Sequence, residues 1–203
     1  MNAVKHAEIS VSRWGGVIED YYPIHHFLDT TKELCSDNRH RILHTMWGVK
    51  RVVIPIFGHT IINSKGKPVN VKDLCERDHI LPDFRNRFIP TLMDFVNTID
   101  ETDLPQGYQQ KIETLHQQYS NHKEIANLLL SPLAQTGKMS SLLLTHNSWF
   151  LNSILPQIFD VEIKLQNFDL SPSVFFEAME FKMWMDNGAE YPASAKKSQL
   201  AVL

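Results

Sequence analysis

The sequence predicts a mainly α-helical protein with one small β-hairpin, built as an α+β N-terminal half followed by an all-α C-terminal half. Apolar residues recur at helical spacing through most of the 203 residues. Only the stretch from Thr60 to Val71 contains two short β-type runs, TII and PVNV, and the turn-forming sequence NSKGK separates them. A hydrophobic fraction of 43% and a charged fraction of 21%, without repeats, are typical of a folded globular chain.

Turn and capping residues bound the helices of the N-terminal half. Gly15 and Gly16 end the first helix, and Pro23 is a favourable first residue for the second. A longer helix begins at Ser36 and Asp37 and runs to Gly58, with a kink or an end near Pro55. We therefore expect helices over residues 4–14, 23–35, 36–58, 71–84 and 90–100.

The C-terminal half lacks metal-ligand spacing and is rich in core-forming side chains. We expect helices over residues 106–119, 122–134, 147–159 and 172–186, and a short strand over 160–166. The turn-prone segment Asp100 to Pro105 is the best candidate boundary. It gives a domain over residues 1–100, a helical extension over 106–190 and a loose tail over 191–203. The histidines of the extension, His116, His122 and His146, are predicted to be isolated and exposed.

Composition argues against several classes of protein. A net charge of −3 disfavours a general nucleic-acid binder, because such proteins neutralise phosphates with Lys and Arg. No apolar run approaches the roughly 20 residues that span a bilayer, and the first residues do not form a signal peptide. Cys35 and Cys75 have no paired spacing, so we expect buried thiols in a cytoplasmic protein.

Seven of the ten histidines lie in residues 1–100, among acidic and arginine side chains. Arginine offers a planar fork for phosphate or carboxylate groups, and histidine adds a further donor. The first interpretation is therefore an anion-binding pocket lined by His6, Arg13, His25, Lys32, Arg39, His40, Arg41 and His44. The alternative is a set of salt bridges in which Glu19, Asp20, Asp29 and Asp37 neutralise the same cations. Burying so many charges without a ligand is costly, which favours the pocket.

A second interpretation is a metal site. His40 and His44 are four residues apart, a spacing that lets two imidazoles on one helix share an ion. The remaining ligands would come from His25, Asp29, His79 and Asp83. The zincin motif has a glutamate directly after its first histidine, but here Arg41 follows His40. An adjacent His-Asp pair of the metal phosphohydrolase type is also absent from the sequence. A structural or surface histidine pair is the alternative.

Residues 6–94 resemble a small family of unknown function that is common in bacteriophage and prophage genomes. Six pieces carry the resemblance, in the family's order and spacing: HAEISVSRWGG, EDYYPIH, Asp29 with Lys32, DNRHRILH, FGHTIINSKGKPVNV and IPTLMDF. The resemblance implies a phage or mobile-element origin and a site made from these polar motifs. Two departures occur: the sequence around His79 is shifted, and Pro82 stands where the family usually has a carboxylate. Family members usually end near residue 100, so the resemblance does not cover 106–203.

Three functions fit these observations. The preferred one is a cytoplasmic, phage-type protein that binds a small phosphorylated or nucleotide-like ligand and withholds it from host defence, without a cofactor. The second is a phosphohydrolase in which histidines and Asp29 or Asp83 hold a divalent metal that activates water. The third is an inhibitor that binds a host protein through its helical C-terminal half. Homo-oligomerisation is left open.

Overall fold

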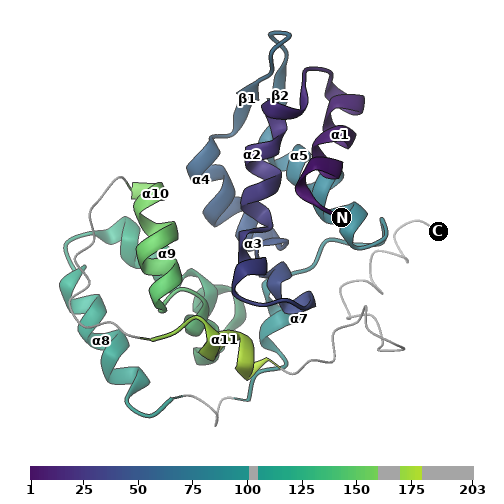
Figure 1. Cartoon of the computed structure of the whole chain (residues 1–203). Coiled ribbons are helices and arrows are strands. Elements are labelled where there is room, and N and C mark those ends of the chain that lie inside the picture. Colours follow the sequence, from purple (N-terminus) through teal and green to yellow (C-terminus); the bar gives the residue numbers. More distant parts are fainter. Residues whose placement is uncertain (101–104, 160–169, 180–203) are drawn as a thin grey trace. The chain divides into compact units, whose positions relative to one another are not determined.

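A computed structural model describes residues 1–100, 105–159 and 170–179 (Figure 1). These residues form two compact units, one of Met1–Thr91 and one that begins at Leu92. The mainly helical fold with a single hairpin, as predicted, is confirmed over this part of the chain. The predicted strand 160–166, the tail 191–203 and most of the boundary segment 100–105 lie outside the described residues.

The first unit contains α-helices, short 3₁₀ helices (η1, η2), two π-helical stretches (η3, η4) and the hairpin. In chain order these are α1 (Ala3–Trp14), α2 (Ile18–Leu28), η1 (Thr30–Glu33), η2 (Asn38–Leu43), α3 (Met46–Gly48), η3 (Val49–Val53), α4 (Ile54–Phe57), β1 (Thr60–Ile62), β2 (Pro68–Asn70), α5 (Val71–Leu74), η4 (Cys75–Ile80) and α6 (Leu81–Asp83). Helices α1 and α2 pack on each other, and the core of the unit includes the fully buried side chains Tyr21, Ile24, Leu28, Ile42, Leu43, Trp47, Leu74, Ile80 and Phe84.

The predicted hairpin is confirmed. Strands β1 and β2 are antiparallel, with Ile61 opposite Val69. Asn63 closes the turn, because its side-chain oxygen accepts hydrogen bonds from the backbone N–H groups of Lys65 and Lys67. The side-chain amide of Asn63 also donates to the hydroxyl of Tyr21, which ties the hairpin to α2.

Three predicted helices have different bounds. The one expected over 90–100 spans only Leu92–Val96. The one expected over 23–35 spans Ile18–Leu28, so Pro23 lies inside it, because the Asp20 carboxylate accepts the N–H of Val17 and caps the earlier start. The predicted helix over 36–58 is interrupted between Leu43 and Met46. There Thr45 adopts an extended backbone conformation, and its hydroxyl accepts the N–H of Gly48, so a new helix starts. The interruption turns His44 into the interior.

The predicted helix over 71–84 is confirmed as the continuous segment α5, η4 and α6. Its middle, η4, is π-helical, a widened form of helix that often occurs at functional sites. Asp78, His79 and Ile80 are consecutive there and all fully buried. Pro82 has no N–H and cannot donate the α-helical hydrogen bond to the Asp78 carbonyl. That carbonyl accepts a hydrogen bond from Nδ1 of His6 at 2.7 Å instead.

The described part of the second unit is helical. It contains α7 (Leu92–Val96), α8 (Tyr108–Gln118), α9 (Lys123–Thr136), η6 (Met139–Leu144), η7 (Phe150–Ile154), α10 (Leu155–Phe159) and α11 (Ser173–Ala178). The 3₁₀ helix η6 packs on α9 and α11. No helix among the described residues has the length and hydropathy that crossing a membrane requires.

Two histidines correct the expectation for this unit, because His146 is fully buried rather than exposed, and it pairs with the half-buried His116, so neither is isolated. The hydroxyl of Thr145, the neighbour of His146, donates to the Leu129 carbonyl of α9, which draws this segment into the core. Nδ1 of His146 donates to the Leu142 carbonyl, and Nε2 lies 3.0 Å from Nε2 of His116.

Replacing His146 by glutamine is expected to reduce the acid sensitivity of the protein. Burial lowers the pKa of His146 to about 3, whereas an unfolded histidine titrates near 6.5. The unfolded state therefore takes up the proton first as pH falls. The folded state is destabilised progressively below pH 6.5, by about 2 kcal/mol at pH 5. Denaturant unfolding at pH 7 and pH 5 should show a smaller loss of stability in His146→Gln than in the wild type.

The exposed His122 offers the matched control for this comparison. His122→Gln should lose as much stability between pH 7 and pH 5 as the wild type. A loss in His146→Gln equal to that of the wild type would contradict the assignment of the acid sensitivity to His146.

Candidate metal centre

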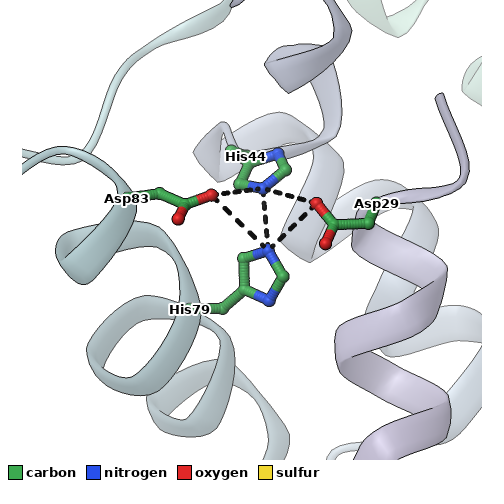
Figure 2. Close-up of side chains that lie close together, drawn as sticks. All are labelled: Asp29, His44, His79 and Asp83. Carbon is green, nitrogen blue, oxygen red and sulfur yellow. Dashed lines mark hydrogen bonds and ion pairs between the residues drawn. The ribbon is translucent and has the colours of Figure 1, made fainter. Parts of the chain in front are cut away.

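Four buried side chains of the first unit converge on one point (Figure 2). Asp29 follows the last residue of α2, His44 follows η2, His79 lies in η4 and Asp83 ends α6. One ligand atom from each of the four lies within 4.8 Å of the others. Nε2 of His44 is 2.8 Å from Nε2 of His79, 3.7 Å from Oδ1 of Asp29 and 3.4 Å from Oδ2 of Asp83. Nε2 of His79 is 3.6 and 3.9 Å from the same two oxygens.

Local structure explains the convergence. His79 and Asp83 are four residues apart in one helical segment, so they share a face. Asp29 occupies the turn between α2 and η1, where its N–H still donates to the His26 carbonyl. His44 occupies the interruption before Thr45. Three separate chain segments therefore bring the four side chains together.

The spacing fits a shared ion. Neighbouring ligand atoms lie about 3.3 Å apart in a tetrahedral shell with bonds of about 2.0 Å, and about 2.8 Å apart in an octahedral one. Five of the six separations are 2.8 to 3.9 Å and span both values, and the sixth, between the two carboxylate oxygens, is at most 4.8 Å. Two imidazole nitrogens and two carboxylate oxygens form a donor set that suits zinc, manganese or iron. The residues therefore fit a divalent transition metal.

The electrostatics place the four groups in their metal-binding forms. Burial alone would raise the pKa of Asp29 and Asp83, but the neighbouring side chains outweigh it, with His79 and Lys32 beside Asp29 and His44 and His6 beside Asp83. Both carboxyl pKa values therefore lie below their ordinary range. Burial lowers the pKa of His44 and His79, and the nearby carboxylates only partly oppose it. Ionised carboxylates and neutral imidazoles are the forms that bind metals.

Three cationic groups and a third histidine surround the carboxylates. Nζ of Lys32 lies 2.7 Å from Oδ1 of Asp29, and Nε of Arg41 lies 3.9 Å from Oδ2 of Asp83. Nε2 of His6 lies 3.2 Å from Oδ1 of Asp83. The amino group of Met1 lies 2.6 Å from the same oxygen. The centre is thus bordered by positive charge at both of its carboxylates.

The structure places the other predicted site residues in different settings. His25 lies beside the four residues, with its Nδ1 3.1 Å from Nδ1 of His79. The ring centroid of His40 is 6.0 Å from that of His44, and its Nδ1 donates to the Asp37 carbonyl. The predicted pairing of His40 with His44 on one helix face is not seen, because the 3₁₀ helix η2 ends between them.

The arginines predicted to hold an anion lie against carboxylates. Arg39 forms an ion pair with Asp37, at 2.6 Å between Nη2 and Oδ2. Arg13 forms one with Asp78, at 2.6 Å between Nε and Oδ1. The pair of Arg39 with Asp37 is one that the salt-bridge alternative named, whereas Asp78, the partner of Arg13, was not among its acids. Among the predicted cations, Lys32 and Arg41 border the centre.

Sequence reasoning missed two residues beside the centre, Asp78 and Ser10. Asp78 is fully buried and accepts hydrogen bonds from Ser10, Arg13 and Trp14. Helical spacing places Ser10 on the same face as His6 and Arg13, which is a usable signal. Asp78 had no such signal, because it directly precedes His79 and an α-helix would direct the two side chains differently. The π-helical widening of η4 buries both.

The fold and the site define a small helical domain with a candidate metal centre, all of it inside the first unit. A family model described as a domain of unknown function, DUF6915, matches residues 1–104. The chain belongs to this family. No curated protein and no solved structure matches the chain.

Proposed function

We propose that the protein is a metal-dependent phosphohydrolase whose single divalent ion is held by Asp29, His44, His79 and Asp83. The observation that carries the proposal is the convergence of their four ligand atoms within 4.8 Å of one another. Buried charges need partners, and four neighbouring electron-rich atoms gain most from a shared cation. Such an ion lowers the pKa of a bound water and supplies a nucleophile at neutral pH.

Lys32 and Arg41 support a phosphate ester as the substrate class. Each cation lies beside one carboxylate of the centre, at 2.7 and 3.9 Å. Ammonium and guanidinium groups stabilise the negative charge that phosphoryl oxygens carry in the transition state. The Lys32 side chain is 39% exposed, which makes the side of Asp29 the approach for a substrate from solvent.

The test combines metal analysis with product detection. The full-length chain is freed of metal with a chelator, reloaded with zinc, manganese, magnesium or iron(II), and incubated with phosphate monoesters, phosphate diesters and nucleotides. We expect one tightly held ion per chain, and phosphate release that disappears with the chelator and returns with metal. A metal-free protein that is folded and fully active would overturn the proposal.

A second candidate is a protein that binds a phosphorylated ligand without cleaving it, such as a nucleotide signal withheld from host defence. Lys32 and Arg41 favour it as well, because they place cations beside both carboxylates of the centre. The two candidates differ in turnover. A thermal shift with a phosphorylated ligand that is recovered intact, in the presence of metal, would favour the binding protein.

A further inference from the structure

Asp78 anchors a chain of hydrogen bonds that leads to the candidate metal centre. Its carboxylate is fully buried, and it accepts from Arg13 Nε at 2.6 Å and from Trp14 Nε1 at 2.7 Å. The Oγ of Ser10 lies 2.9 Å from Oδ2 of Asp78. A carboxylate paired with Arg13 has acceptors only, and it lies nearer to Ser10 than the His6 carbonyl does at 3.3 Å, so the hydroxyl of Ser10 donates its one hydrogen to Asp78.

The direction of this first bond determines the next two. Because the hydrogen of Ser10 is used, its oxygen accepts from Nε2 of His25, which lies 2.8 Å away. His25 is fully buried, and a neutral imidazole that donates from Nε2 has its lone pair on Nδ1. Nδ1 of His79 lies 3.1 Å from Nδ1 of His25 and therefore donates to this lone pair. The hydrogen of the His79 ring is then on Nδ1, and Nε2 is free of hydrogen.

We propose that Asp78, Ser10 and His25 form a relay that holds His79 in the Nδ1–H tautomer and presents its Nε2 lone pair to a cation. The relay rests on the proposed metal centre and adds three positioning residues to it. Histidines that bind metals commonly donate their second ring N–H to a fixed acceptor, which sets the tautomer and ring orientation. Here the acceptor is a second histidine, and its own orientation is set by a serine and a buried carboxylate.

The Nδ1–H tautomer of His79 explains why a cation would be bound favourably in the centre. The Nε2 lone pair of His79 faces Nε2 of His44 at 2.8 Å, Oδ1 of Asp29 at 3.6 Å and Oδ2 of Asp83 at 3.9 Å. When His44 also carries its hydrogen on Nδ1, four acceptors face one another and repel, whereas a divalent ion among them satisfies all four. Asp78 also orients a second ring, because its backbone carbonyl accepts from Nδ1 of His6. One residue of the π-helical segment thus positions two imidazoles.

The tautomer can be read directly by long-range ¹H–¹⁵N spectra of the full-length, histidine-labelled protein without metal. The expected result is a hydrogen on Nδ1 of His79 and on Nε2 of His25. A hydrogen on Nε2 of His79 in the wild-type protein would overturn the relay. This measurement needs no variant and no enzymatic activity.

A variant tests the link at Ser10. Ser10→Ala removes the hydroxyl and is compatible with α1, because alanine is a good helix former. We expect mixed tautomers of His25 and His79 and zinc binding weakened by about 10- to 100-fold, the usual effect of losing such a support. Ser12→Ala, at an exposed position of the same helix, should leave both unchanged. Zinc affinity and tautomers in Ser10→Ala equal to those in Ser12→Ala would also overturn the relay.

The outcomes separate the two proposals. If the protein binds zinc with the expected tautomers but cleaves no phosphate ester, the phosphohydrolase fails and the relay stands. If phosphate esters are cleaved in a metal-dependent way while His79 carries its hydrogen on Nε2, the relay fails and the phosphohydrolase stands.

Discussion

Replacing Asp83 by asparagine is expected to abolish metal-dependent turnover and to weaken metal binding by more than about 100-fold, beyond the usual loss from removing a supporting residue. Asparagine keeps the size of the side chain but removes the negative charge. Oδ2 of Asp83 lies 3.4 Å from Nε2 of His44 and 3.9 Å from Nε2 of His79, so it is central to the set. Metal titration and phosphate release measure the two effects.

Asp73 provides the matched control for this variant. It lies in α5 of the same helical segment and is only partly buried, so Asp73→Asn should bind metal and turn over as the wild type does. Metal should also stabilise the wild type and Asp73→Asn by about 2.7 kcal/mol at 100 times the dissociation constant, and Asp83→Asn far less. Wild-type metal affinity in Asp83→Asn would refute the assignment of Asp83 as a ligand.

Gly48→Ala is expected to destabilise the first unit by about 3 kcal/mol and to disrupt the centre through His44. A Cβ at this position would lie 2.3 Å from the carbonyl oxygen of Leu43 and 2.8 Å from its Cα. These are backbone atoms, so no side-chain rotation relieves the contact. The break that positions His44 between Leu43 and Thr45 would have to open. Denaturant unfolding and zinc titration of the same sample measure both consequences.

The sign of the Gly48 effect is informative, because alanine normally stabilises a helix relative to glycine by about 0.5–1 kcal/mol. Gly66→Ala in the hairpin turn is the control. Gly66 has a φ of +74°, but no heavy atom lies within 4 Å of the position that an alanine Cβ would occupy there. Its substitution should cost only about 1 kcal/mol and leave metal binding intact. Equal stability of Gly48→Ala and wild type would show that the contact with Leu43 is not maintained in solution.

Local sequence signals predicted much of the fold. The apolar spacing before Gly15 predicted α1, and the NSKGK turn predicted the hairpin, because both depend on residues close in the chain. The helix expected over 36–58 was wrong for a different reason. Its interruption depends on the hydroxyl of Thr45 and on the close approach of Gly48 to Leu43. The spacing of apolar residues does not predict such contacts.

The candidate site was predictable in its membership but not in its arrangement. Asp29, His44, His79 and Asp83 all belong to the metal-ligand set expected from the sequence, and the structure brings these four together. The pairing of His40 with His44 was the wrong starting point, because it assumed an unbroken helix. Asp78 could not be assigned at all, since the widening of η4 does not follow from the spacing of apolar residues.

The π-helical segment η4 also makes the centre sensitive to chain length in a way that side-chain substitutions do not reveal. A π-turn contains one residue more than an α-turn, so η4 already holds the equivalent of a one-residue insertion in an α-helix. Removing a single residue between Cys75 and Ile80 would restore a regular α-helix. The side chain of Asp78, which belongs to the relay, would then be rotated away from the two ligands that follow it in the chain, His79 and Asp83. Insertions and deletions within this segment should therefore be far less tolerated than exchanges of one buried side chain for another.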